Sequence, residues 1–244
     1  KDKALEAYKA KYAITIKDEE KIAKKALELA VSLKQHIKYS KNSDLLLEES
    51  DNEVLIKIEN NIKAHKLANE LLFDDNNWLH NPNVFTSNEF HINWDIKVNN
   101  EDLIICKSLI DRLIINHNTK TIKLIDLKTT SSSDFKGSFN KYDYARQLAF
   151  YWLAITHYFI NTFKDKNISE YKQESYIITV NTNDASVNVY KIKEDILLEK
   201  TEIIYKILND INWHLKTNNW EYTREYYEGD GSETLYINND KYSR

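Results

Sequence analysis

The segment 109–130, LIDRLIINHNTKTIKLIDLKTT, consists of two apolar runs on either side of the polar residues 116–120. Apolar and other residues alternate in each run, which predicts two β-strands joined by a turn. We expect a symmetrical hairpin in which Asp111 and Asp126 face each other at the end of an otherwise apolar face. The predicted strands are 109–115 and 121–129.

The two facing carboxylates predict a cation site. Like charges directly opposite on neighbouring strands, roughly 5 Å apart, are destabilising unless something offsets them. Mg²⁺ is commonly held by one or two carboxylates together with water and phosphate oxygens. Lys128 lies two residues after Asp126 and shares its face, where an ammonium can stabilise charge on a reacting phosphate. The alternative is that Asp111 and Asp126 are ordinary strand-end charges and that Lys128 is an ion-pair partner.

The segment around 144–158 predicts a buried helix, because it is apolar on nearly every side. Gln147 and Tyr151 lie one turn apart on it. A glutamine on a buried face requires a hydrogen-bond partner, and a metal site beside the helix would supply one. The alternative is that the aromatic residues at helical spacing are core packing.

Three motifs, Ile110–Leu113, Ile125–Thr130 and Gln147–Tyr151, together resemble the PD-(D/E)XK nucleases of the RecB/RecE type. This group includes phage exonucleases similar to lambda exonuclease. The resemblance implies an α/β fold with a restriction-endonuclease-like core, in which a mixed central sheet is flanked by helices after an N-terminal helical region. One departure is Ser108, which stands where many members have glycine three residues before the first aspartate.

The resemblance also implies which residues act. It implies a Mg²⁺ site, with Mn²⁺ as a substitute, formed by Asp111, Asp126 and the backbone carbonyl of Leu127. The residues with implied catalytic roles are Asp111, Asp126, Lys128, Gln147 and Tyr151.

Two further metal contacts are candidates. The family carries an upstream metal-binding histidine, and His65 lies on the apolar stripe of a helix predicted over 53–73. Its alternative role is that of a core histidine with a local partner. Related exonucleases place a glutamate on the strand before the first aspartate, which makes Glu89, at the start of the alternating segment 89–96, a candidate water or metal contact. Its alternative role is that of a solvated strand charge.

The polar stretch 129–141 predicts a loop that becomes ordered when DNA binds. Lys136, Lys141 and Arg146 are candidate phosphate contacts around it, and the alternative is a plain solvent loop. The net charge of −4 argues mildly against a general DNA coat, but it leaves room for a local basic groove.

The composition, with 244 residues, 42% hydrophobic residues, one Pro and three Gly, predicts one core without a flexible linker. The expected organisation is a single nuclease domain over 1–244. It consists of a helical N-terminal region (1–75), a catalytic sheet core (85–192) and a C-terminal helix with an aromatic tail (194–244).

The sequence shows no apolar run long enough to span a membrane and no signal peptide. Cys106 is the sole cysteine, which suits a reducing compartment and excludes the four-cysteine iron–sulfur cluster of some relatives. We therefore expect the cytoplasm of a bacterium or of a phage-infected host cell.

These patterns predict a Mg²⁺-dependent DNA nuclease, with a 5′-to-3′ double-strand exonuclease of phage recombination and repair as the favoured form. DNA is the expected partner, and a single-strand annealing protein and a ring-like homo-oligomer are further expected partners. Two alternatives stay open within the enzymes: the nuclease module of a helicase–nuclease, and an endonuclease. A third is a catalytically silent nuclease-fold protein that binds DNA or protein.

Overall fold

The computed structural model describes residues 24–31 without 26 and 29, 49–73, 81–99 and 102–234. The chain divides into two compact units, Lys1–Ile56 and Lys57–Arg244, and the boundary falls within helix α3 (Glu49–Ala64). The first unit is described only at a few helical positions, so the expected single domain over 1–244 stays a prediction. No helix of the described residues is both long and apolar enough to cross a membrane.

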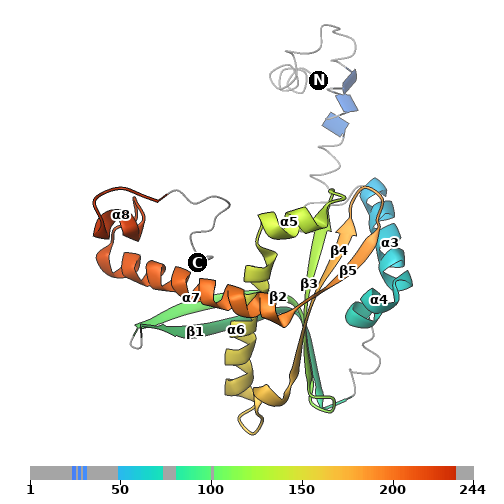
Figure 1. Ribbon diagram of the computed structural model, residues 1–244. Helices are drawn as coiled ribbons and strands as arrows, with labels where there is room; N and C mark the ends of the chain where they lie inside the picture. Colours follow the sequence, from blue (N-terminus) through green and yellow to red (C-terminus); the bar gives the residue numbers. More distant parts are fainter. Residues whose placement is uncertain are drawn as a thin grey trace. The chain divides into compact units, whose positions relative to one another are not determined.

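The second unit is built around a five-stranded mixed sheet in the order β1-β2-β3-β4-β5 (Figure 1). All neighbouring strands are antiparallel except β3 and β4, which are parallel and joined through helices. The strands are β1 (Val84–Val98), β2 (Asp102–Asn116), β3 (Thr121–Thr130), β4 (Lys172–Asn181) and β5 (Val187–Ile192). The helices of this unit beyond α3 are α4 (Lys66–Phe73), α5 (Phe135–Lys141), α6 (Tyr144–Thr162), η2 (Ile168–Glu170), α7 (Glu194–Thr217) and α8 (Arg224–Glu228).

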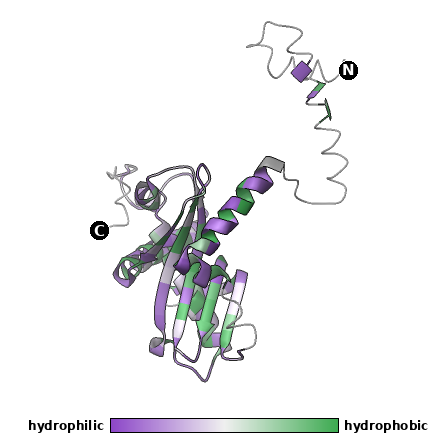
Figure 2. Cartoon of the chain, turned by 90° about the vertical axis from the view of Figure 1, so that its right-hand side faces the viewer, coloured by the Kyte–Doolittle hydropathy of each residue, from purple (hydrophilic) through white to green (hydrophobic). Residues whose placement is uncertain are grey.

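Helices cover both faces of the sheet. Successive residues of the central strands point to opposite faces and are apolar, so both faces have to be covered. Leu113 and Leu124 point into a core shared with α6 and α7. Ile114 and Ile125, one residue along, point into a second core with α3 and α4. Figure 2 shows the hydrophobic residues concentrated in the strands. The architecture confirms the predicted α/β fold, with helices before the sheet and a restriction-endonuclease-like mixed core.

The predicted hairpin register is confirmed. Leu113 pairs with Leu124 and Arg112 with Ile125, so the next pair in the same register is Asp111 and Asp126. Beyond this point β2 leaves β3 and continues with β1 alone. The two carboxylates therefore lie where β2 and β3 separate, and of the two Asp111 is partly exposed there whereas Asp126 is buried.

The helix expected over 53–73 is interrupted, which corrects the prediction. His65 lies in a bend between α3 and α4, and its Nδ1 accepts a hydrogen bond from the backbone N–H of Ala68 at 3.2 Å. A side-chain acceptor that satisfies a free amide at a helix start favours a new helix there over a continuous one. The apolar stripe continues across the break, so the sequence pattern did not reveal it.

The predicted loop 129–141 is also partly wrong, because its second half forms helix α5. Asp134 caps this helix by accepting from the backbone N–H of Gly137 at 2.8 Å. A Cβ at position 137 would collide with Oδ2 of Asp134, so a larger residue would displace the capping carboxylate. Phe135 is buried against the sheet and anchors the helix.

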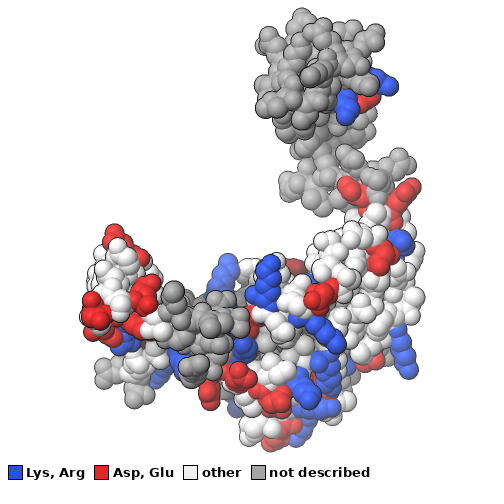
Figure 3. Space-filling view, turned by 45° about the horizontal axis from the view of Figure 1, so that its top comes forward, with Lys and Arg blue, Asp and Glu red and all other residues white. Residues whose placement is uncertain are grey.

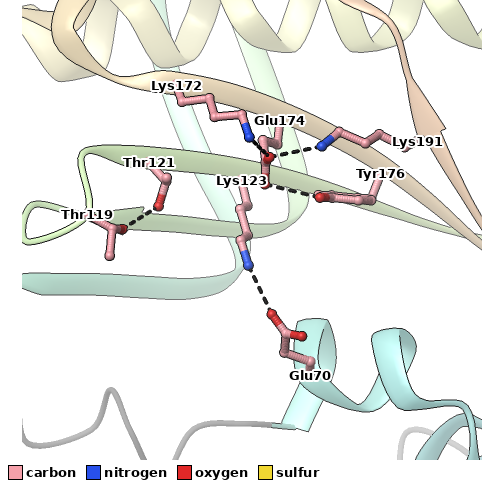
Figure 4. Close-up of polar contacts among 8 residues, drawn as sticks. All are labelled: Glu70, Thr119, Thr121, Lys123, Lys172, Glu174, Tyr176 and Lys191. Carbon is pink, nitrogen blue, oxygen red and sulfur yellow. Dashed lines mark hydrogen bonds and ion pairs between the residues drawn. The ribbon is translucent and has the colours of Figure 1, made fainter.

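On the α4 face, a polar cluster ties β4 to β5 (Figure 4). Glu174 is buried and accepts from Lys172 at 2.8 Å, Lys191 at 2.9 Å and the Tyr176 hydroxyl at 3.0 Å. Burial alone would raise the pKa of Glu174, but these hydrogen bonds outweigh it and lower the pKa to about 2. Every donor of the cluster serves one carboxylate, which therefore stays charged.

Candidate functional site

Asp126 and Lys128 form an ion pair at the point where the sheet opens. Lys128 Nζ lies 3.1 Å from Oδ1 and 2.9 Å from Oδ2 of Asp126, whose residue is only 1% exposed. Burial raises the pKa of the Asp126 carboxyl to about 6, although the hydrogen bond and charge of Lys128 act against it. One lysine does not compensate fully for the loss of water, so this carboxylate is poorly stabilised.

Asp111 is held beside this pair by the backbone of β3. Its Oδ2 accepts a hydrogen bond from the N–H of Leu127 at 2.7 Å. The negative charge of Asp111 contributes to the raised pKa of Asp126. The opposition of the two aspartates was predicted from the hairpin, whereas the bond to the Leu127 amide was not.

Gln147 connects helix α6 to the strand residues. Its Oε1 accepts from Lys128 Nζ at 3.1 Å, and its Nε2 donates to the Tyr151 hydroxyl at 2.8 Å and to Asp126 Oδ1 at 3.5 Å. Burial raises the pKa of Tyr151, so its hydroxyl stays protonated at neutral pH. The structure thus brings Asp111, Asp126, Lys128, Gln147 and Tyr151 together from two strands and one helix.

Tyr144 is a site residue that sequence reasoning missed. Lys128 Nζ lies over its ring, 5.0 Å from the centroid, which is cation–π geometry. Phe135 of α5 stacks on Tyr144, with centroids 5.9 Å apart, and on Tyr190 of β5 at 5.0 Å. The available signal was the spacing of three residues between Tyr144 and Gln147, which places both on one helix face.

His65 is not brought into this network. It belongs to the helices that pack on the opposite face of the sheet, and its Nδ1 caps α4. Within the part of the chain that the structure describes, no three His, Cys, Asp or Glu side chains gather as a metal-binding group. His65 therefore does not complete a three-ligand set with Asp111 and Asp126.

Glu89 lies level with Asp111 on the neighbouring strand, because Asn88 pairs with Arg112 and Phe90 with Ile110. It is exposed, and its φ of 47° interrupts the regular alternation of side chains along β1. The register thus places Glu89, Asp111 and Asp126 in a row across three strands. The three carboxylates nevertheless do not converge on one point.

The donor set fits a divalent cation that prefers oxygen ligands. Asp126 Oδ2 is buried and accepts no hydrogen bond, although it lies in the ion pair with Lys128. Asp111 is partly exposed beside it. Asp111, Asp126 and the carbonyl of Leu127 would hold Mg²⁺ or Mn²⁺, with water and substrate oxygens as the remaining ligands. The cation would compete with Lys128 for the same carboxylate.

The three predicted phosphate contacts lie on α5 and α6. Lys136 and Lys141 are exposed, and Lys141 Nζ lies 5.2 Å from the ring centroid of Tyr142. Arg146 Nε lies 3.5 Å from Asp143 Oδ2. Figure 3 shows Lys and Arg side chains interspersed with Asp and Glu over the middle of the molecule, whereas Asp and Glu predominate at its left-hand end.

Comparisons with known proteins add little. No family model and no curated protein matches this chain. Eleven chains of solved structures match, and one of them is described as "Crystal structure of SSO0001". It is 13% identical, the match covers 82% of each chain, and the TM-score is 0.32. A likeness at that TM-score supports no conclusion about fold or function.

Proposed function

We propose that this protein is a metal-dependent nuclease that hydrolyses DNA phosphodiester bonds, with a 5′-to-3′ double-strand exonuclease as the favoured form. One arrangement carries the proposal. Lys128 lies between the buried carboxylate of Asp126 and the amide of Gln147, beside Asp111, at the opening of the sheet. Two carboxylates and an ammonium in that geometry suit the hydrolysis of a phosphodiester.

The site residues would have different roles in the reaction. A bound divalent cation would act as a Lewis acid toward water and the phosphate oxygens. Lys128 would stabilise the negative charge that develops on the phosphate oxygens as water attacks and the ester P–O bond breaks. Gln147 orients the Lys128 ammonium by accepting from it, and Tyr151 holds Gln147 through its hydroxyl.

Two enzyme alternatives remain beside the exonuclease: an endonuclease and the nuclease module of a helicase–nuclease. A catalytically silent binding protein is the alternative outside the enzymes. Loss of one member of the Asp–Asp–Lys set would favour the silent protein. All three residues are present: Lys128 pairs with Asp126, and Asp111 is bonded to the backbone N–H of Leu127 between them, which supports an enzyme.

The test uses linear duplexes labelled at the 5′ or the 3′ end and a covalently closed circle, each with Mg²⁺, Mn²⁺, Ca²⁺ or EDTA. We expect Mg²⁺ or Mn²⁺ to release nucleotides from the 5′ end of linear DNA and to leave the circle intact. Cleavage of the circle would identify an endonuclease. Rapid hydrolysis in EDTA, or duplex binding without cleavage in any metal, would refute the proposal.

Lys128→Met and Lys123→Met provide a matched pair of variants. Both lysines lie on β3, but Lys123 bonds to Glu70 on the other side of the sheet, 3.3 Å away. We expect the first variant to cleave about 100- to 1,000-fold more slowly and the second to cleave like the unchanged protein. Equal activity of the two variants would remove Lys128 from the chemistry.

A further inference from the structure

A groove of about 530 Å³ lies between α6 and α7, next to the site. Its wall is largely apolar and includes Phe150, Ile207, Leu208 and Ile211, while Arg146 and Gln147 supply polar groups on the α6 side. The volume falls in the range of pockets that hold small organic groups. We call this feature the α6–α7 groove.

Gln147 belongs to both the groove and the site. The same side chain that lines the groove accepts a hydrogen bond from Lys128 Nζ at 3.1 Å. The groove therefore begins one side chain away from the ammonium that would face the scissile phosphate. A group bound there is a near neighbour of the bond that breaks.

Charged side chains lie at the rim of the groove. Arg146 and Asp143 both line it and lie 3.5 Å apart, and Lys200 of α7, which does not line the groove, also pairs with Asp143 at 3.1 Å. Tyr142, which is 57% exposed, also lines the rim, and Lys141 lies over its ring. An apolar floor, an exposed aromatic ring and an arginine at the rim suit a planar base joined to a phosphate.

We propose that the α6–α7 groove receives the base of the nucleotide next to the scissile phosphate, while an adjoining phosphate lies at Arg146. This assignment rests on the proposed nuclease function and defines its substrate more narrowly. A paired base inside a duplex is stacked on both faces and cannot enter a groove. A paired terminal nucleotide of a duplex must therefore leave its partner before it is cut, so a duplex end with unpaired terminal nucleotides is cut faster than a fully paired end.

The test compares two Mg²⁺-supported substrates that differ in one nucleotide. One is an oligonucleotide with an unpaired end, and the other carries an abasic residue next to the bond that is cut. We expect the missing base to lower kcat/KM about tenfold, the scale of losing one stacked base. A paired end should be cut more slowly than the unpaired end of the same sequence.

Ile207→Trp and Tyr205→Trp supply the variant and its control. Ile207 lines the groove, whereas Tyr205 lies on the same helix, is 39% exposed and does not line it. We expect Ile207→Trp to cut the intact substrate as slowly as the unchanged protein cuts the abasic one, with no further abasic penalty. Tyr205→Trp should behave like the unchanged protein.

The outcomes separate the two levels of the proposal. Cleavage with equal kcat/KM for intact and abasic substrates would overturn the groove assignment and leave the nuclease function standing. Because that comparison uses the unchanged protein, it holds even if Ile207→Trp fails to fold. If the unchanged protein shows no abasic penalty and Ile207→Trp elutes at a different volume, the groove is a protein contact and the assignment is overturned. Absence of cleavage of any substrate would overturn both proposals.

Discussion

Asp126 and Glu174 are buried carboxylates on neighbouring parallel strands, yet they point to opposite faces of the sheet and titrate in opposite directions. Glu174 has two lysines and a tyrosine hydroxyl, and its pKa falls to about 2. Asp126 has one lysine and a neighbouring aspartate, and its pKa rises to about 6. Glu174 thus has enough donors to stay charged, whereas Asp126 has too few, and the proposed cation would supply the compensation that Asp126 lacks.

The largest expected effect is on cleavage, and it distinguishes the lysine at Asp126 from the lysines at Glu174. Lys128→Met should lower single-turnover cleavage by about 100- to 1,000-fold, because a transition-state charge loses its counter-charge. Metal affinity should persist, since a protonated lysine has no lone pair for a cation. Isothermal titration with Mn²⁺ and a quenched cleavage assay measure the two effects.

Lys191→Met is the control, because it removes a lysine from Glu174 on the other face. It should leave cleavage per folded molecule unchanged. Equal losses of cleavage in Lys128→Met and Lys191→Met would mean that the groups around Asp126 have no role in cleavage that those around Glu174 lack.

The second expected effect is on how the free energy of unfolding depends on pH. Asp126 binds a proton more tightly in the folded protein than at its ordinary pKa of 3.8, so its contribution is fully present below pH 4 and is lost as pH rises through about 6. The loss amounts to about 3 kcal/mol at most. Urea unfolding of the metal-free protein measures the change in the free energy of unfolding between pH 4 and pH 7. This change should differ by that amount between the unchanged protein and Asp126→Asn.

Glu174 should act in the opposite sense. Its lowered pKa stabilises the folded protein above about pH 4.5, and this contribution is lost as pH falls toward 2. Glu174→Gln should therefore flatten the acid limb of the stability curve. If Asp126→Asn flattened that acid limb instead, the two carboxylates would have been assigned the wrong way round.

A smaller effect is expected from Gln147, which accepts a hydrogen bond from Lys128, and from Tyr151, which holds Gln147. Gln147→Ala should lower cleavage by about 10- to 100-fold, and Tyr151→Phe by about tenfold, as hydrogen bonds to the site are lost. The melting temperature of Tyr151→Phe should change little. A large drop in melting temperature with normal cleavage per folded molecule would show that the pair is core packing.

The smallest effect concerns Tyr144. Removing its ring from Lys128 in Tyr144→Leu should cost about 1 kcal/mol, or about fivefold in kcat. Tyr144→Phe keeps the ring and should restore kcat. An unchanged kcat in Tyr144→Leu would assign Tyr144 to the aromatic stack with Phe135 alone.

Much of the site was readable because it lies in local patterns. The period-two alternation of 109–115 and 121–129 determined the register of the hairpin, since a slip by one residue would turn every apolar side chain to the other face. The opposition of Asp111 and Asp126 follows from that register. The spacing of Gln147 and Tyr151 placed both on one helix face in the same way.

Tertiary structure decided what depends on partners distant in the chain or on competition between local signals. The sequence did not reveal that Lys128 lies over Tyr144 or that Glu174 gathers Lys191, because neither follows from the period of one element. The break at His65 was hidden because a side-chain cap and an apolar stripe compete within the same residues, and the stripe continues on both sides. By itself the sequence determined which chemical groups share a face. The packing of α6 against β3 decided which of them meet and how far their charges are compensated.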